Sequence, residues 1–356
     1  MPARFQRIPC ALCDYQAFSD IDLEKHLEHS HGVVVEPLPD VVVEYALAPA
    51  PEPEPEAVTG PDPGPEPPSP APALPSGLEI PDVDPTFWVA DRHVQLLLAV
   101  SDLTREGEIV NVLLTGPKGT GKTSLPREFA ATYQRPFFTV HCQLIGERDD
   151  WWGSKELSLE RGTYYDRAAF LDAVETPGCV VLLDEANRTH PENLNALFGF
   201  LDHRRSAYIP ALKQEVSVAP GVSFFMTLNE GFEYMAINPI DEALRDRMSY
   251  VLRMTYVPRD VETELLTRRT GVDLATAERL VEFAGTVRRN PKLTIPISTR
   301  QLLAAAGLIA RRLPVPEAVL FSCINGLPAD IDRTALLQAL QMLGSVDEDW
   351  VYGGNN

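Results

Sequence analysis

The chain has 356 residues, 44% of them hydrophobic, which is enough for two or three folded domains of ordinary size. Acidic residues outnumber basic ones 51 to 31, and the formal net charge of −20 disfavours a protein that coats nucleic acid. No stretch approaches the roughly 18 apolar residues that a membrane span requires, and no apolar secretory signal opens the chain. We therefore expect a cytoplasmic protein without a membrane partner.

The first segment has the spacing of a zinc finger. Cys10, Cys13, His26 and His31 follow the two-cysteine, two-histidine pattern, which predicts a zinc-bound ββα domain over residues 1–32. His29 is an alternative fourth ligand. A segment of about 30 residues cannot stabilise itself by apolar burial alone, and metal ligation is a common remedy. The alternative is an amphipathic helix without a metal.

The helix of this predicted finger is acidic. Asp20, Glu24 and Glu28 surround the positions that would read DNA bases and would repel phosphate. We therefore expect the finger to dock a protein, with DNA binding through nearby basic side chains as the weaker alternative.

Residues 33–85 have the composition of an acidic, proline-rich, disordered linker. Residues 26–91 include 13 acidic residues and no lysine or arginine, and residues 49–85 include 14 prolines. Such a segment cannot bury a core and favours extended polyproline II conformations. Most of the net charge therefore belongs to the arm and says little about the domains that follow.

After the linker, strand-like apolar runs alternate with helical stretches. The runs occupy residues 109–115, 136–140, 180–183 and 222–228, which predicts an α/β domain with a parallel sheet over residues 86–256. Helical periodicity prevails beyond residue 257, so we expect an all-helical domain over residues 257–356. Three cysteines in apolar segments, Cys142, Cys179 and Cys323, are expected to be free buried thiols.

A phosphate-binding pattern, G-x-x-x-x-G-K-T, follows the first of these runs. Its glycines let backbone N–H groups surround phosphates, Lys122 can reach the β and γ phosphates, and the Thr123 hydroxyl can ligate Mg²⁺. Pro126 falls in the first turn of the next helix, where its missing N–H costs no intrahelical bond. The predicted nucleotide-binding residues of the loop are Gly116, Pro117, Lys118, Gly119, Thr120, Gly121, Lys122, Thr123 and Ser124.

Polar residues end two of the later runs. Asp184 is expected to bind Mg²⁺ directly or through water, and Glu185 to polarise the water that attacks the γ phosphate. Asn229, after the next run, is placed to hold that water. An acidic pair after a strand is by itself a common solvation pattern, but beside the phosphate loop it predicts a hydrolytic site.

Three further arginines are candidates for contact with a nucleotide. Arg245 and Arg247 have no obvious local role, so one of them is expected to reach the γ phosphate of a neighbouring subunit; surface ion pairing is the alternative. Arg300 opens an apolar helix that Ser298 or Thr299 can cap. A cation in a first turn opposes the helix dipole, and a nearby anion would explain it.

In order along residues 85–345, five segments resemble the AAA+ P-loop ATPases of the MoxR group and their CbbQ/NorQ relatives. They are LLTGPKGTGKTSL, LLDEANRTHPENLNALFGFLDHRR, FFMTLNEG, PIDEALRDRM and STRQLLAAAGLI. The resemblance implies an α/β domain with a helical lid that hydrolyses ATP with Mg²⁺. It makes Asn229 the first sensor, Arg300 the second sensor, and Arg247, ahead of Arg245, the arginine finger. Arg188 also matches a family arginine that faces the neighbouring subunit.

The same resemblance implies a ring, usually a hexamer, that remodels a partner protein recruited here by the finger. Residues 144–171 and 204–216 resemble inserted hairpins near the ring pore. Trp151 and Trp152 look hard to bury locally, so we expect them to contact substrate in the pore or the adjacent subunit. The alternative functions are a nucleic-acid motor or helicase loader acting on DNA, and a nucleotide-binding protein without turnover. For a motor, candidate strand-gripping cations are Arg148, Lys155, Arg204 and Lys213.

Overall fold

The computed structural model describes residues 8–9, 16–17, 74–158, 162–229, 240–290, 293, 296–327, 336–337 and 340. In the amino-terminal segment it describes the short antiparallel strands β1 (Ile8–Pro9) and β2 (Gln16–Ala17). Most of the linker lies outside the described residues, so the finger and the linker stay predictions. Also outside them are the predicted zinc ligands Cys10, Cys13, His26, His29 and His31.

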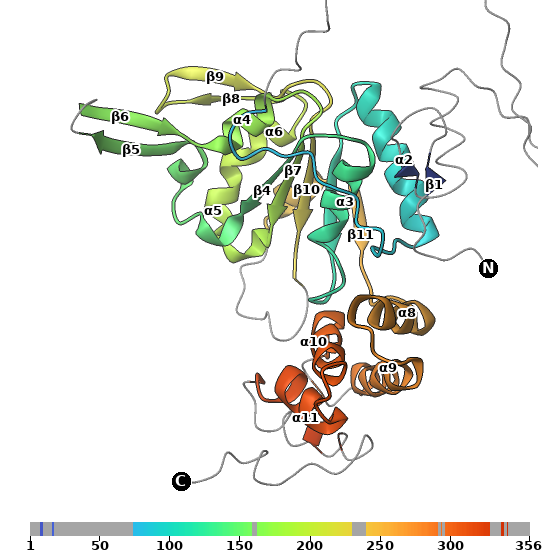
Figure 1. Ribbon diagram of the computed structural model, residues 1–356. Helices are drawn as coiled ribbons and strands as arrows, with labels where there is room; N and C mark the ends of the chain where they lie inside the picture. The colour runs from blue at the N-terminus through green and yellow to red at the C-terminus, as the bar shows by residue number, and fades with distance from the viewer. Residues whose placement is uncertain are drawn as a thin grey trace, which may run out of the picture.

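A five-stranded parallel sheet forms the centre of the α/β part (Figure 1). Its strand order is β11-β3-β10-β7-β4. The strands are β3 (Asn111–Thr115), β4 (Phe137–His141), β7 (Val180–Asp184), β10 (Ser223–Thr227) and β11 (Tyr250–Arg253). Each of the four apolar runs coincides with one of these strands to within two residues at either end, which confirms the α/β expectation. Strand β11 was missed because it is an edge strand with a single buried residue, Leu252, and so lacks an apolar run.

Helices cover both faces of the sheet. α2 (Asp91–Arg105) and α3 (Ser124–Thr132) pack on one face, and α4 (Ala169–Glu175), α5 (Pro191–Leu194) and α6 (Phe198–Leu201) on the other. Side chains of a strand alternate between the faces. In β3, Val112 and Leu114 accordingly join the α2–α3 core while Leu113 joins the opposite one. Burial on both faces explains why these strands read as unbroken apolar runs.

Short helical segments complete this part of the chain. Among the described residues four are 3-10 turns, and α7 is a brief helix before β11. Their bounds are Cys142–Leu144, Arg148–Trp151, Ala186–Arg188, Asn195–Leu197 and, for α7, Glu242–Asp246.

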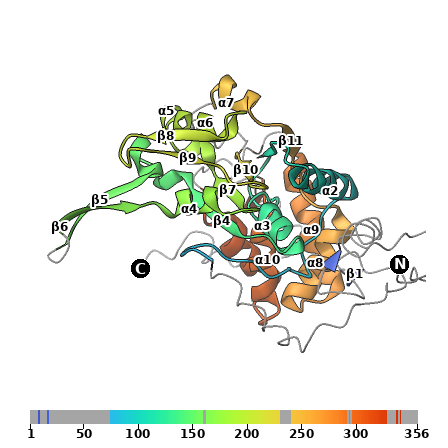
Figure 2. The same cartoon turned by 90° about the horizontal axis from the view of Figure 1, so that it is seen from above.

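Two antiparallel hairpins interrupt the α/β pattern, as the sequence predicts. β5 (Gly153–Ser158) pairs with β6 (Gly162–Arg167), and β8 (Ser206–Ile209) pairs with β9 (Gln214–Ser217). The β5–β6 ribbon projects from the body of the protein (Figures 1 and 2). Leu157 on this ribbon is 81% exposed.

The expectation that two adjacent tryptophans face a pore or a neighbour is wrong. Trp151 and Trp152 are only 1% and 5% exposed and belong to the core beneath α4–α6. The Trp151 indole N–H donates to the Asn193 carbonyl oxygen at 2.9 Å, and each indole packs edge-on against a phenylalanine, Phe170 or Phe200. The turn at Arg148–Trp151 directs both rings inward, which the polar local sequence hides.

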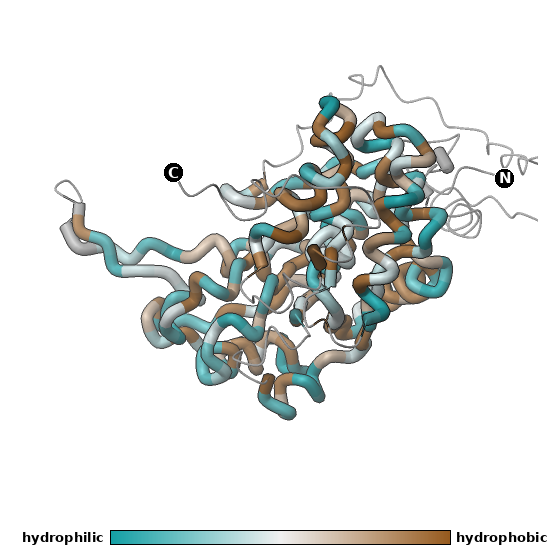
Figure 3. Tube along the Cα trace, turned by 90° about the horizontal axis from the view of Figure 1, so that it is seen from below, coloured by the Kyte–Doolittle hydropathy of each residue, from teal (hydrophilic) through white to brown (hydrophobic). Residues whose placement is uncertain are grey.

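The remaining described helices form a separate layer with its own core. They are α8 (Arg259–Thr270), α9 (Leu274–Arg289), α10 (Thr299–Ile309), α11 (Val315–Val319) and a π-helical turn (Leu320–Ile324). Leu280, Ala284 and Leu302 are fully buried in this core. Figure 3 shows how hydrophobic and hydrophilic residues alternate along the described chain. A helical carboxyl-terminal part is thus confirmed.

One further expectation concerns three cysteines. Cys142, Cys179 and Cys323 are free and buried, as predicted. Within the described ranges, no helix is long and apolar enough to span a membrane.

Candidate ATP-binding and hydrolysis site

The phosphate loop connects β3 to α3 and is packed closely on three sides. Gly116, Gly119 and Gly121 all have positive φ angles, of 134°, 74° and 89°. A Cβ atom on Gly116 would lie 2.2 Å from the Met254 carbonyl oxygen, and one on Gly119 would lie 2.6 Å from the Ser298 Cβ. Gly116 and Gly119 therefore combine a conformation that other residues resist with contacts that leave no room for a side chain.

Polar groups of the loop face one another. The Lys122 ammonium donates to the carbonyl oxygens of Gly116 and Pro117 at 2.8 and 2.7 Å, and the Thr120 hydroxyl donates to the latter oxygen at 2.9 Å. The Lys122 side chain is thus buried over the loop. A loop of backbone N–H groups with a lysine over it is suited to bind the phosphates of a nucleotide.

An oxygen-rich cluster lies where β7 and β10 end. The Asp184 Oδ1 atom accepts hydrogen bonds from Thr123 Oγ1 at 2.9 Å and from Thr227 Oγ1 at 2.7 Å. The Thr227 hydroxyl also accepts from the Glu185 N–H at 2.8 Å. Mg²⁺ prefers oxygen ligands such as carboxylates and hydroxyls, so the Asp184 carboxylate and the Thr123 hydroxyl fit this ion. Sequence reasoning missed Thr227, whose one signal is its place at the end of a strand beside the acidic one.

The predicted catalytic carboxylate, Glu185, and the predicted first sensor, Asn229, are in direct contact. Asn229 Nδ2 donates to Glu185 Oε1 at 2.6 Å, and Arg188 Nε lies 3.5 Å from Glu185 Oε2. Glu185 has a φ of +52°, a left-handed conformation that non-glycine residues adopt at a cost and that often marks functional sites. Asn229 and Arg188 therefore hold the carboxylate at the edge of the sheet, next to Asp184.

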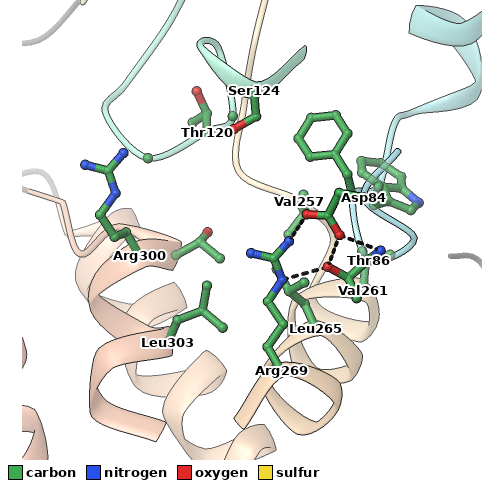
Figure 4. Close-up of a pocket in the computed structure, with 15 residues that line it drawn as sticks. Asp84, Thr86, Thr120, Ser124, Val257, Val261, Leu265, Arg269, Arg300 and Leu303 are labelled. Atoms are coloured by element: carbon green, nitrogen blue, oxygen red, sulfur yellow. Dashed lines mark hydrogen bonds and ion pairs between the residues drawn. The ribbon is translucent and has the colours of Figure 1, made fainter. Parts of the chain in front are cut away.

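A cavity of about 260 Å³ separates the phosphate loop from the helical layer (Figure 4). On one side Arg269 binds Asp84 and Thr86, which ties α8 to the segment before α2. Arg300 extends from the first turn of α10 toward the loop, is exposed, and makes no ion pair with any described residue. The lining residues are Asp84, Thr86, Phe87, Trp88, Gly119, Thr120, Gly121, Ser124, Val257, Val261, Leu265, Arg269, Thr299, Arg300 and Leu303.

The two candidate finger arginines differ in their surroundings. The Arg247 guanidinium donates to the Ala243 carbonyl oxygen at 2.6 Å and lies 4.2 Å from the Phe198 ring centre. It therefore has a local contact that the sequence does not reveal. The Arg245 side chain is exposed and makes no ion pair or hydrogen bond with the part of the chain that the structure describes. In that same part, no cluster of three or more His, Cys, Asp or Glu side chains could hold a metal ion by itself.

Comparison with known proteins accounts for this arrangement. The model of the AAA domain (dynein-related subfamily) matches residues 111–248, and that of the CbbQ/NirQ/NorQ C-terminal family matches residues 262–343. A protein of Thauera aromatica named "Putative chaperone BssE" is 38% identical over 246 residues, covering 68% of this chain and 84% of its own. The chain belongs to the MoxR/CbbQ-type AAA+ ATPases. It is accordingly an ATPase, with ATP and Mg²⁺ as the implied nucleotide and metal.

More distant proteins are also similar to this AAA+ ATPase. An uncharacterized protein of Staphylococcus aureus is 26% identical over 241 residues, which cover 65% of this chain and 90% of that protein. RuvB of Thermotoga maritima has 17% identity and a TM-score of 0.45, over 69% of this chain and 72% of that one.

Proposed function

We propose that this AAA+ ATPase forms a ring, a hexamer by analogy with its family, and uses ATP hydrolysis to remodel a partner protein. The observation that carries the proposal is the hydrolytic set at the edge of the sheet, where Glu185 contacts Asn229 beside the Asp184–Thr123 pair. The chaperone name of the Thauera relative supports a protein as the substrate.

Each residue of the set has a chemical role in this proposal. Lys122 and the loop N–H groups bind the phosphates, and Thr123 and Asp184 hold Mg²⁺, which neutralises phosphate charge when bound. Glu185 accepts a proton from the attacking water. Asn229 fixes the direction in which the Glu185 carboxylate faces, because its amide donates to Oε1. Arg300 contacts phosphate from the lid.

The site is completed in trans in this proposal. An arginine of one subunit stabilises the charge that develops on the γ phosphate of its neighbour. The family pattern favours Arg247, whereas exposure favours Arg245, because its guanidinium needs no local bond to be broken. Single Arg→Ala variants, each mixed with Glu185→Gln subunits, separate the two. The variant that lacks the finger should be inactive alone and regain partial turnover in the mixture, because the Glu185→Gln subunits supply the missing arginine. The other variant should be active without mixing.

In this proposal the predicted finger and linker recruit the partner protein to the ring. Zinc held by Cys10, Cys13, His26 and His31 would fold a small protein-docking module, and the acidic linker would keep it extended from the ring. Zinc content measured on the full chain and on a Cys10→Ser, Cys13→Ser variant tests the metal. About one zinc per chain, lost in the variant, is the expected result.

The deciding experiment measures ATP hydrolysis by the full-length protein alone, with single- or double-stranded DNA, and with proteins trapped by the Glu185→Gln variant. Glu185→Gln should lower turnover about 100-fold or more and keep ATP binding. Glu192→Gln is a matched control, since its carboxylate is exposed on α5. Stimulation by a trapped protein supports the proposal, whereas strong stimulation by DNA favours a nucleic-acid motor.

One observation weighs against the motor. Arg204, one of the candidate cations for gripping a strand, is already paired with Asp202 at 2.8 Å.

A further inference from the structure

A buried ion pair lies inside the helical lid, away from the hydrolytic residues. Arg288 of α9 binds Glu262 of α8 through two parallel hydrogen bonds, Nη1 to Oε2 at 2.8 Å and Nη2 to Oε1 at 2.9 Å. The Glu262 side chain is 1% exposed and that of Arg288 is 13% exposed. Removing two charges from water is costly, and a well-packed apolar pair would often be as stable. The contacts of this pair therefore need an explanation besides stability.

The ion pair holds the chain on both sides of Ser298. Arg288 Nε donates to the Ile297 carbonyl oxygen at 2.8 Å, and Thr299 Oγ1 donates to Glu262 Oε1 at 2.6 Å. Ser298, between these two residues, packs against the phosphate loop at Gly119. Residues 297–299 are therefore each held by a contact of their own. The next residue is Arg300, which extends toward that loop (Figure 4).

A second connection joins the same pair to the loop. The Arg288 guanidinium lies 3.8 Å from the centre of the Tyr256 ring, a cation–π contact at short range. The Tyr256 hydroxyl donates to the Lys118 carbonyl oxygen in the loop at 3.2 Å. Tyr256 lies between β11 and α8, where the sheet ends and the lid begins. The ion pair therefore contacts both the hinge and the start of α10.

We propose that Glu262 and Arg288 are positioning residues of the ATPase site: they fix residues 297–299, and with them Arg300, relative to the phosphate loop. The proposal rests on the role given above to Arg300. In this proposal neither Glu262 nor Arg288 contacts the nucleotide. They act through the Thr299 hydroxyl and the Ile297 carbonyl on one side and through the Tyr256 ring on the other. A displacement of about 1 Å at a site of this kind can slow turnover up to 100-fold.

The test combines variants of Thr299 with Arg300→Ala. Thr299→Val removes the hydroxyl bond to Glu262 and keeps the side-chain shape, whereas Thr299→Ser keeps the bond. We expect Thr299→Val to lower kcat about tenfold and Thr299→Ser to stay within about twofold of the parent. Thr286→Val controls for loss of a helix-surface hydroxyl, because the Thr286 hydroxyl is exposed and donates to the Glu282 carbonyl oxygen of its own helix at 3.0 Å. Glu262→Gln is measured alongside, with circular dichroism to show that each variant folds.

The decisive readout is additivity. In the Arg300→Ala background, Thr299→Val should have less than about a twofold effect on kcat, since there is no longer an arginine to position. A full tenfold loss in that background would overturn the positioning role alone. An unchanged kcat in Arg300→Ala would overturn it together with the role of Arg300. Hydrolysis is measured without any partner protein, so failure of the proposed remodelling activity would not affect either result.

Discussion

Replacing Trp151 with alanine should unfold the α/β part at lower temperature because this residue is in the core. Its ring is 1% exposed, packs edge-on against Phe170 at 5.2 Å, and its N–H bonds Asn193 at 2.9 Å. Truncation of a buried tryptophan costs about 3–5 kcal/mol. At about 2–4 °C per kcal/mol for a domain of this size, the melting temperature should fall by about 6–20 °C.

The assay is thermal and urea unfolding of the full chain followed by circular dichroism, with two comparison variants. Trp151→Phe keeps a six-membered aromatic ring and loses the five-membered ring with its N–H, which should cost about 1 kcal/mol or somewhat more because the Asn193 carbonyl loses its partner. Leu157→Ala changes a side chain that is 81% exposed on the projecting ribbon and should cost less than about 0.5 kcal/mol. Unchanged stability of Trp151→Ala with loss of substrate-stimulated hydrolysis would refute burial and restore the pore interpretation.

Two further predictions follow from the loop and the thiols. Gly119→Ala places a Cβ 2.6 Å from Ser298 Cβ at a φ of +74°, so the KM for ATP should rise more than about tenfold. Gly107→Ala, with a similar φ of +88° and open space, should leave KM unchanged; equal effects would contradict the contact argument. Burial raises the pKa of Cys179 and Cys323 to about 12, although nearby arginines oppose the shift, so iodoacetamide should label both far more slowly in the native protein than in urea at pH 8. Because the folded pKa is raised, the stability that these buried thiols supply is full below their unfolded pKa of about 8.5 and is lost as the pH rises toward 12. Rapid native labelling at both sites would show that the thiols are accessible.

Much of the nucleotide site follows from local sequence because its parts sit at the ends of strands. The G-x-x-x-x-G-K-T pattern, Asp184 and Asn229 each follow an apolar run, and in a parallel sheet such ends meet at one edge. Thr123 bonds Asp184 and Asn229 bonds Glu185 accordingly. The Ser298 cap of α10 was also one of two alternatives that the sequence offered, and the structure selects it.

Other features depend on contacts between residues far apart in the chain. Trp151 and Trp152 sit in a polar stretch, and only the helices packed above them make that site a core. Arg247 bonds the Ala243 carbonyl oxygen of its own segment, but the ring under its guanidinium, Phe198, belongs to another element. No local sequence pattern predicts the burial of the tryptophans or the Arg247–Phe198 contact, because both depend on how separate elements pack.

The amino-acid sequence by itself determined the α/β fold, the phosphate loop and its acidic partners, because apolar runs, glycine spacing and strand-end carboxylates are local patterns with a direct chemical meaning. Its resemblance to known ATPases supplied the AAA+ assignment. It also located most of the −20 charge in the amino-terminal arm, away from the ATPase. Only the tertiary structure decided how the lid is attached to that loop. The bonds from Arg288 to Glu262, and from Thr299 to Glu262, join three helices over 26 and 37 positions of sequence. Such pairs form where packing brings helices together, and the tertiary fold alone determines which charges meet.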